Sequence, residues 1–78
     1  MFDLTDEISI NLAFISGVET YLLGGENNST IPAVQISMTN GNKYNIKGMD
    51  AYNFLVKGIK SEKLWQILSN KIQEYSSH

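Results

Sequence analysis

The sequence lacks cysteine and arginine, and it contains one proline and one histidine among its 78 residues. Without cysteine the chain forms no disulfide and offers neither a thiolate nucleophile nor a zinc site built on cysteines, which fits a reducing compartment such as the cytoplasm. The single histidine, His78, is the last residue, where chains usually fray. Because catalysis by acid and base most often uses histidine, we expect no enzyme activity, no metal and no cofactor.

Long hydrophobic runs and a basic N-terminus are also missing. Asp3, Asp6 and Glu7 stand where a secretory signal would carry basic residues, and no apolar run approaches the roughly 18 residues of a membrane span. Hydrophobic residues nevertheless make up 42% of the chain and the net charge is −2, as in folded globular domains. We therefore expect one soluble, cytoplasmic domain over residues 1–78, with a flexible leader at 1–6.

The first half of the chain predicts a hairpin over residues 8–23. Apolar and polar residues alternate over 8–14, which is the period of a strand with one buried face. Ser16 and Gly17 offer a two-residue turn, and a second strand follows over 18–23.

A second hairpin is predicted over residues 33–47, after an exposed loop at 24–32. Its register follows from parity, because residues directly opposite each other in an antiparallel pair share a face. A two-residue turn would place the apolar side chains of the two strands on opposite faces. A three-residue turn with Gly41 in a left-handed bulge pairs Ile36 with Tyr44 and keeps the apolar side chains together. We therefore predict the bulged turn.

The remaining residues predict two helices, over 50–57 and 61–75. Asp50 is the residue type of an N-cap, and Met49 before it has the position of a hydrophobic staple. Gly58 is typical of a left-handed C-cap, and the second helix carries one apolar stripe. Together the elements predict an α+β fold, in which a four-stranded, mostly antiparallel sheet of two hairpins precedes two C-terminal helices packed on one face.

Charge is distributed unevenly along the chain. All six lysines lie within residues 40–78, whereas residues 1–39 contain five acidic residues and no lysine. Such asymmetry can mark a face that binds nucleic acid. The candidate basic patch comprises Lys43, Lys47, Lys57, Lys60 and Lys63. Nucleic-acid binding is the weaker alternative, because arginine supplies the commonest specific base contact and the chain has none.

Half-exposed aromatic residues are candidates for a protein interface, because Trp and Tyr are enriched among binding hot spots. Trp65 lies at the margin of its helical stripe, and Tyr52 lies on the outer side of the first helix. On the sheet face away from the helices, the predicted pairing leaves Ile15, Val18 and Leu22 exposed, where a partner or a second copy would cover them. These five residues form the candidate protein interface.

The sequence favours a small non-catalytic protein-binding module, an adaptor or an inhibitor, with a protein partner and no membrane contact. Its many Asn, Ile, Lys and Tyr residues are typical of a low-GC bacterium or its phage. In size and strand-then-helix order it resembles small phage inhibitors of host defence, including anti-CRISPR proteins, and the resemblance implies inhibition of a host protein without assigning any residue. The two alternatives are nucleic-acid binding through the lysines and a homo-oligomeric structural subunit.

Overall fold

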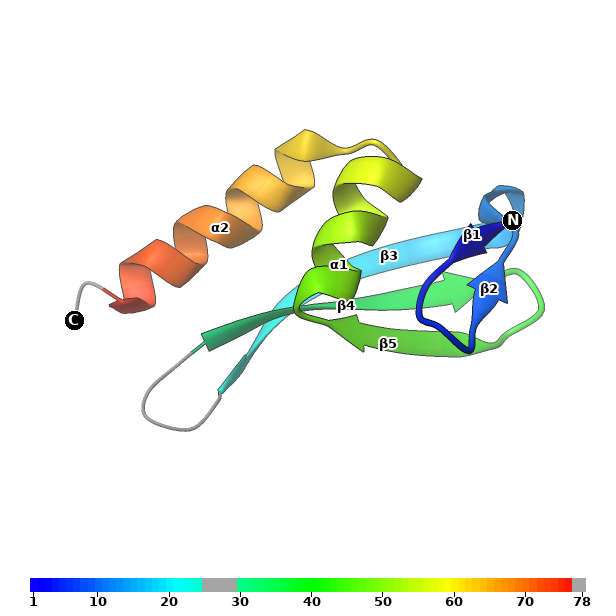
Figure 1. Cartoon of the computed structure of the whole chain (residues 1–78), viewed down its shortest axis with the longest axis horizontal. Coiled ribbons are helices and arrows are strands. Elements are labelled where there is room, and N and C mark those ends of the chain that lie inside the picture. Colours follow the sequence, from blue (N-terminus) through cyan, green and yellow to red (C-terminus); the bar gives the residue numbers. More distant parts are fainter. Residues whose placement is uncertain (25–29, 77–78) are drawn as a thin grey trace.

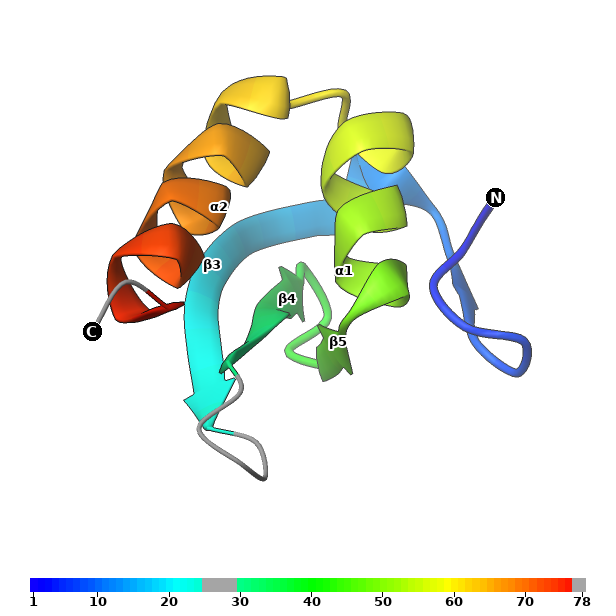
Figure 2. The ribbon, with the colours of Figure 1, turned by 60° about the vertical axis from the view of Figure 1, so that its left-hand side comes forward.

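The computed structural model describes residues 1–24 and 30–76, so part of the predicted loop at 24–32 lies outside the described residues. The described part of that prediction is wrong, because residue 24 ends one strand and residues 30–32 begin the next. The elements in chain order are strand β1 (Phe2–Asp3), strand β2 (Ser9–Ile10), the 3₁₀ helix η1 (Leu12–Phe14), strands β3 (Ile15–Gly24), β4 (Thr30–Met38) and β5 (Lys43–Lys47), helix α1 (Met49–Asn53), the π-helical turn η3 (Phe54–Gly58) and helix α2 (Glu62–Ser76). Both helices lie on one face of the sheet that contains β3, β4 and β5 (Figures 1 and 2). The predicted α+β class is confirmed.

The strands form two sheets rather than the predicted four-stranded sheet. β1 and β2 form an antiparallel ribbon, and β3, β4 and β5 form a three-stranded antiparallel sheet with β4 in the centre. The predicted hairpin over 8–23 is wrong, because the chain does not turn after Ile15. It continues as the single ten-residue strand β3, which bulges between Ile15 and Gly17 and pairs with β4.

Residues 8–14 do not form one strand with a buried face. Ile10 is buried and Leu12 packs against the core, but Ile8 is 36% exposed and Phe14 is 56% exposed. The alternation ends because the chain enters η1 directly after the short strand β2.

The N-terminal residues belong to the fold, so the predicted flexible leader at 1–6 is wrong. The Leu4 side chain is only 1% exposed. The Phe2 ring packs edge to face on Phe54, with ring centroids 6.1 Å apart. A Cβ atom on Gly58 would lie 3.2 Å from the Phe2 ring, so glycine at this position permits the close contact between the ribbon and η3.

The bulged turn predicted for the second hairpin is confirmed. Ile36 lies opposite Tyr44, and Gly41 has a left-handed φ of 92°. The Met38 N–H donates to the Asn42 carbonyl at 2.8 Å, which closes the three-residue turn. This register places the apolar side chains of both strands beneath the helices.

The first helix begins and ends differently from the prediction. α1 begins at Met49 after Gly48, and no side chain caps it, so Asp50 lies in the first turn rather than at the N-cap. Gly58 is a buried residue of η3 and not the left-handed C-cap. The left-handed residue is Lys60, with a φ of 55°.

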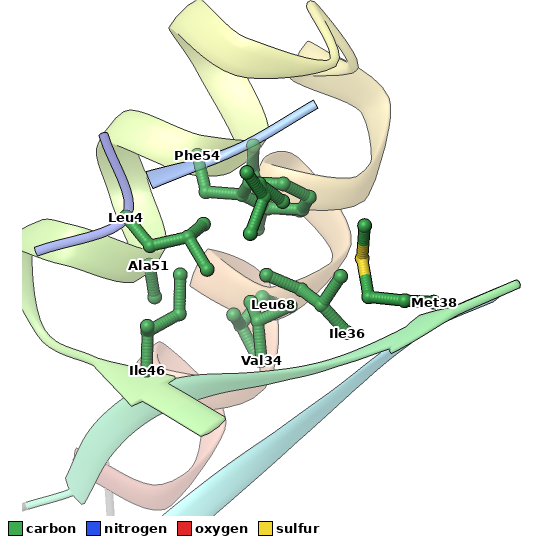
Figure 3. Packing of buried hydrophobic residues seen from close by; sticks show 10 residues of the cluster. Leu4, Val34, Ile36, Met38, Ile46, Ala51, Phe54 and Leu68 are labelled. Carbon is green, nitrogen blue, oxygen red and sulfur yellow. The ribbon is translucent and has the colours of Figure 1, made fainter. Parts of the chain in front are cut away.

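The core fills the space between the sheet and the helices (Figure 3). Its fully buried side chains come from the ribbon, the central strand and the helical layer, and the largest are Phe54, Leu4, Ile36, Leu55, Leu68 and Val34. No polar or charged side chain is buried within the described residues. Removal of apolar surface from water is therefore the main source of stability, at about 25 cal/mol per Å².

Replacing Gly48 with alanine is expected to lower the free energy of unfolding by about 1–3 kcal/mol, because residues other than glycine rarely adopt its backbone conformation. Gly48 has φ 64° and ψ −132°, and no heavy atom lies within 4 Å of an added Cβ, so backbone strain alone causes the loss. Chemical denaturation measures it. Gly24→Ala is the matched control, since that site is equally open and has no positive φ. Equal stability of the two variants would contradict the conformation of Gly48.

Candidate protein-binding surface

Tyr52 of α1 and Trp65 of α2 meet where the two helices lie next to each other. Their rings pack edge to face, with centroids 4.9 Å apart and an interplanar angle of 78°. Such a pair stabilises a protein by about 0.5–1.5 kcal/mol beyond the burial of its surface. Both side chains remain partly exposed, and Trp65 also packs against the core. The structure therefore brings these two candidate interface residues together, and each also helps to join the helices.

Met49 extends the aromatic pair onto open surface. Its side chain is 70% exposed, and it lies three positions before Tyr52, so the two are neighbours on the helix surface. The sequence interpretation missed Met49 by placing it before the helix as an apolar partner of Phe54. A helix that begins at Met49 puts this side chain opposite the buried Ala51 and Phe54. We call Met49, Tyr52 and Trp65 the helix-joint surface.

Ile15, Val18 and Leu22 lie on the helix-covered side of the sheet, so their predicted position on the opposite face is wrong. Val18 is opposite Ile36, which is fully buried, and residues opposite each other share a face. All three pack against the core from partly buried positions on β3. The face away from the helices instead carries the intervening side chains, such as the exposed Glu19. A binding role for the three residues stays a prediction.

The five candidate lysines are all exposed, but they do not share one surface. Lys43 and Lys47 alternate with core-facing residues along β5, so their side chains point away from the helices. Lys57, Lys60 and Lys63 lie between the end of η3 and the start of α2, in the layer on the other side of the sheet (Figure 1). A nucleic acid on one face would meet only part of this set, which limits the number of phosphates it could neutralise.

The acidic side chains do not gather into a metal site, since residues 1–24 and 30–76 contain no group of three or more His, Asp or Glu placed to hold an ion. None of the helices in this part of the chain has the length and apolar character needed to cross a bilayer. The chain has no significant match among protein-family models, curated proteins or solved structures.

Proposed function

We propose that this protein is a small, non-catalytic protein-binding module, and that the helix-joint surface contacts its partner. The supporting observation is the 70% exposed side chain of Met49 beside the edge-to-face pair of Tyr52 and Trp65. Met, Tyr and Trp are enriched at protein interfaces, and Trp and Tyr dominate binding hot spots. A partner docked on this surface would bury Met49 and complete the burial of both rings.

The partner we propose is another protein of the same cytoplasm, so that the module acts as an adaptor or as an inhibitor. Composition and architecture support an accessory protein of a low-GC bacterium or its phage, with inhibition of a host-defence protein as one form of this role. Nucleic-acid binding has less support, because the lysines are divided between the two sides of the sheet.

Met49→Glu is expected to abolish the capture of a protein partner, because it introduces a charge at an apolar contact whose burial excludes water. The free energy of unfolding should change by less than about 0.5 kcal/mol, as is usual for exposed positions. Affinity capture from cells of the source organism, with quantification of each retained protein, measures the first effect. Thermal unfolding of the purified variant measures the second.

Phe14→Glu is the matched control, since Phe14 is also exposed, at 56%, but belongs to η1 rather than to a helix of the joint. A protein that the wild type and Phe14→Glu retain, and that Met49→Glu loses, is the expected result. A protein retained by Met49→Glu and lost with Phe14→Glu would contradict the proposal. Binding of a generic oligonucleotide that weakens steeply as salt rises would favour the nucleic-acid alternative.

A further inference from the structure

The edge of β3 that faces away from β4 has no partner strand within residues 1–24 and 30–76. After the bulge between Ile15 and Gly17, β3 keeps a regular register from Gly17 to Gly24, so most of this edge is regular strand. A regular strand edge presents a row of N–H and C=O groups that can pair with another strand.

The two edges of the sheet differ in how they are protected against such pairing. The other edge, β5, is five residues long and carries Lys43 and Lys47. Lysine and short length are common barriers to edge-to-edge association. β3 is ten residues long and contains neither lysine nor proline, and Glu19 is its only charged residue. The edge suited to pairing is therefore that of β3.

We infer that β3 pairs in antiparallel fashion with β3 of a second copy, about a twofold axis at Thr20. The two three-stranded sheets would then form one continuous sheet, with the helices of both copies on the same face. This interface goes beyond the proposed function, because it uses a different surface from the helix joint.

The side chains of β3 select this register. The side chains of Val18, Thr20 and Leu22 point toward the helices. The apolar side chains of the two copies stay on one face only if these residues of one copy lie opposite the same set in the other. An axis at Glu19 would set two carboxylates directly opposite each other, and like charges in this position are destabilising. An axis at Tyr21 would set the polar Thr20 against the apolar Leu22. An axis at Thr20 pairs Thr20 with itself and Val18 with Leu22, and it sets Glu19 opposite Tyr21.

The same register explains why the proposed partner is a second copy. Each copy contributes Val18 against Leu22 and Glu19 against Tyr21, so each favourable pair forms twice. No like charges oppose each other directly, and the edge is complementary to itself, as a twofold interface requires.

Helix α2 presents an apolar side chain toward this edge. α2 contacts β3 and β4, whereas α1 contacts β4 and β5. Trp65 faces α1, and Ile67 is about 200° further round the helix, so Ile67 lies on the flank turned away from α1. Its side chain is 42% exposed. Neighbouring strands lie about 4.8 Å apart, so α2, centred over β3 and β4, would lie about 4.8 Å from the twofold axis beside β3. The axes of the two α2 helices would then be about 10 Å apart, which is the spacing of packed helices.

A cysteine scan tests the interface, because the chain contains no cysteine of its own. Thr20→Cys would place two thiols on residues directly opposite each other, with Cα atoms about 4.5–5.5 Å apart, a separation that a disulfide can bridge. Under mild oxidation with glutathione we expect a covalent dimer as the main product. We expect the unmodified chain to sediment as a dimer that dissociates on dilution.

Glu19→Cys is the matched control on the same strand. In the proposed register its two thiols lie on diagonal neighbours about 7–8 Å apart, which is too far for a disulfide without movement of the backbone. Three results would each overturn the inference. The two variants could cross-link equally, or the chain could form a dimer in which Thr20→Cys does not cross-link. The third such result is an unmodified chain that stays monomeric at every concentration. Met49→Glu should leave the dimer intact, so the two proposals can fail separately.

Discussion

Replacing Phe54 with alanine is expected to lower the free energy of unfolding by about 3–5 kcal/mol, the usual loss for a buried aromatic side chain. The Phe54 ring is fully buried and contacts the Phe2 ring edge to face, so its removal leaves a cavity between η3 and the N-terminal ribbon. The free energy of unfolding of a domain of this size is about 4–12 kcal/mol in total, so the variant loses a large share of its stability. Urea denaturation followed by Trp65 fluorescence measures the change.

Phe14→Ala makes the same chemical change at a position that is 56% exposed. It should lower the free energy of unfolding by at most about 2 kcal/mol, well below the loss for Phe54, because more than half of the Phe14 surface stays in water in the folded protein. Equal losses in the two variants would show that Phe54 does not occupy the core.

Replacing Met38 with lysine is expected to lower the free energy of unfolding by about 2–5 kcal/mol from the loss of its buried side chain, and the cost of burying a charge adds to this. Met38 is 8% exposed and belongs to the core cluster beneath the helices. The same experiment tests the bulged turn, because a two-residue turn would direct Met38 to the opposite face from the apolar residues of β5.

Thr39→Lys is the control for this experiment. Thr39 follows Met38 directly and is exposed in the turn, where a lysine side chain stays in water. Its effect on stability should fall within about 0.5 kcal/mol. If Met38→Lys were as mild as Thr39→Lys, the register of the second hairpin would be wrong.

The second hairpin could be predicted because its register depends on neighbouring residues alone. The turn at Gly41 and the parity of the flanking apolar residues leave one arrangement that buries them together. The first hairpin could not be predicted in this way. Val18 and Leu22 alternate with Tyr21 and Leu23, so either face of this strand can be buried, and its pairing with distant β4 decides the outcome.

The N-terminal ribbon was missed for a related reason. Its acidic residues indicate an exposed leader, although the apolar Phe2 and Leu4 lie on either side of Asp3. The contact of Phe2 with Phe54 joins residues that are far apart in the sequence, and no local pattern reports it. Periodicity identifies a face within one element but cannot show which other element covers it.

The candidate binding surface was predictable in part. Tyr52 and Trp65 could be chosen from their type and their place on each helix, but their mutual contact depends on how the helices pack. Met49 was missed because the helix start was placed one residue too late. The lysines look like one group in the sequence, yet the sheet separates them, because β5 and the helices lie in different layers.

The position of the N-terminal ribbon also has a consequence for synthesis on the ribosome. Phe2 and Leu4 leave the ribosome before Phe54, which Phe2 contacts and which is made some fifty residues later. The neighbouring strands β3, β4 and β5 can pair first, because hairpins form from nearby residues within microseconds. The ribbon must wait until η3 has emerged, and contacts between such distant residues form slowly. The apolar side chains of Phe2 and Leu4 therefore stay exposed until η3 has been translated.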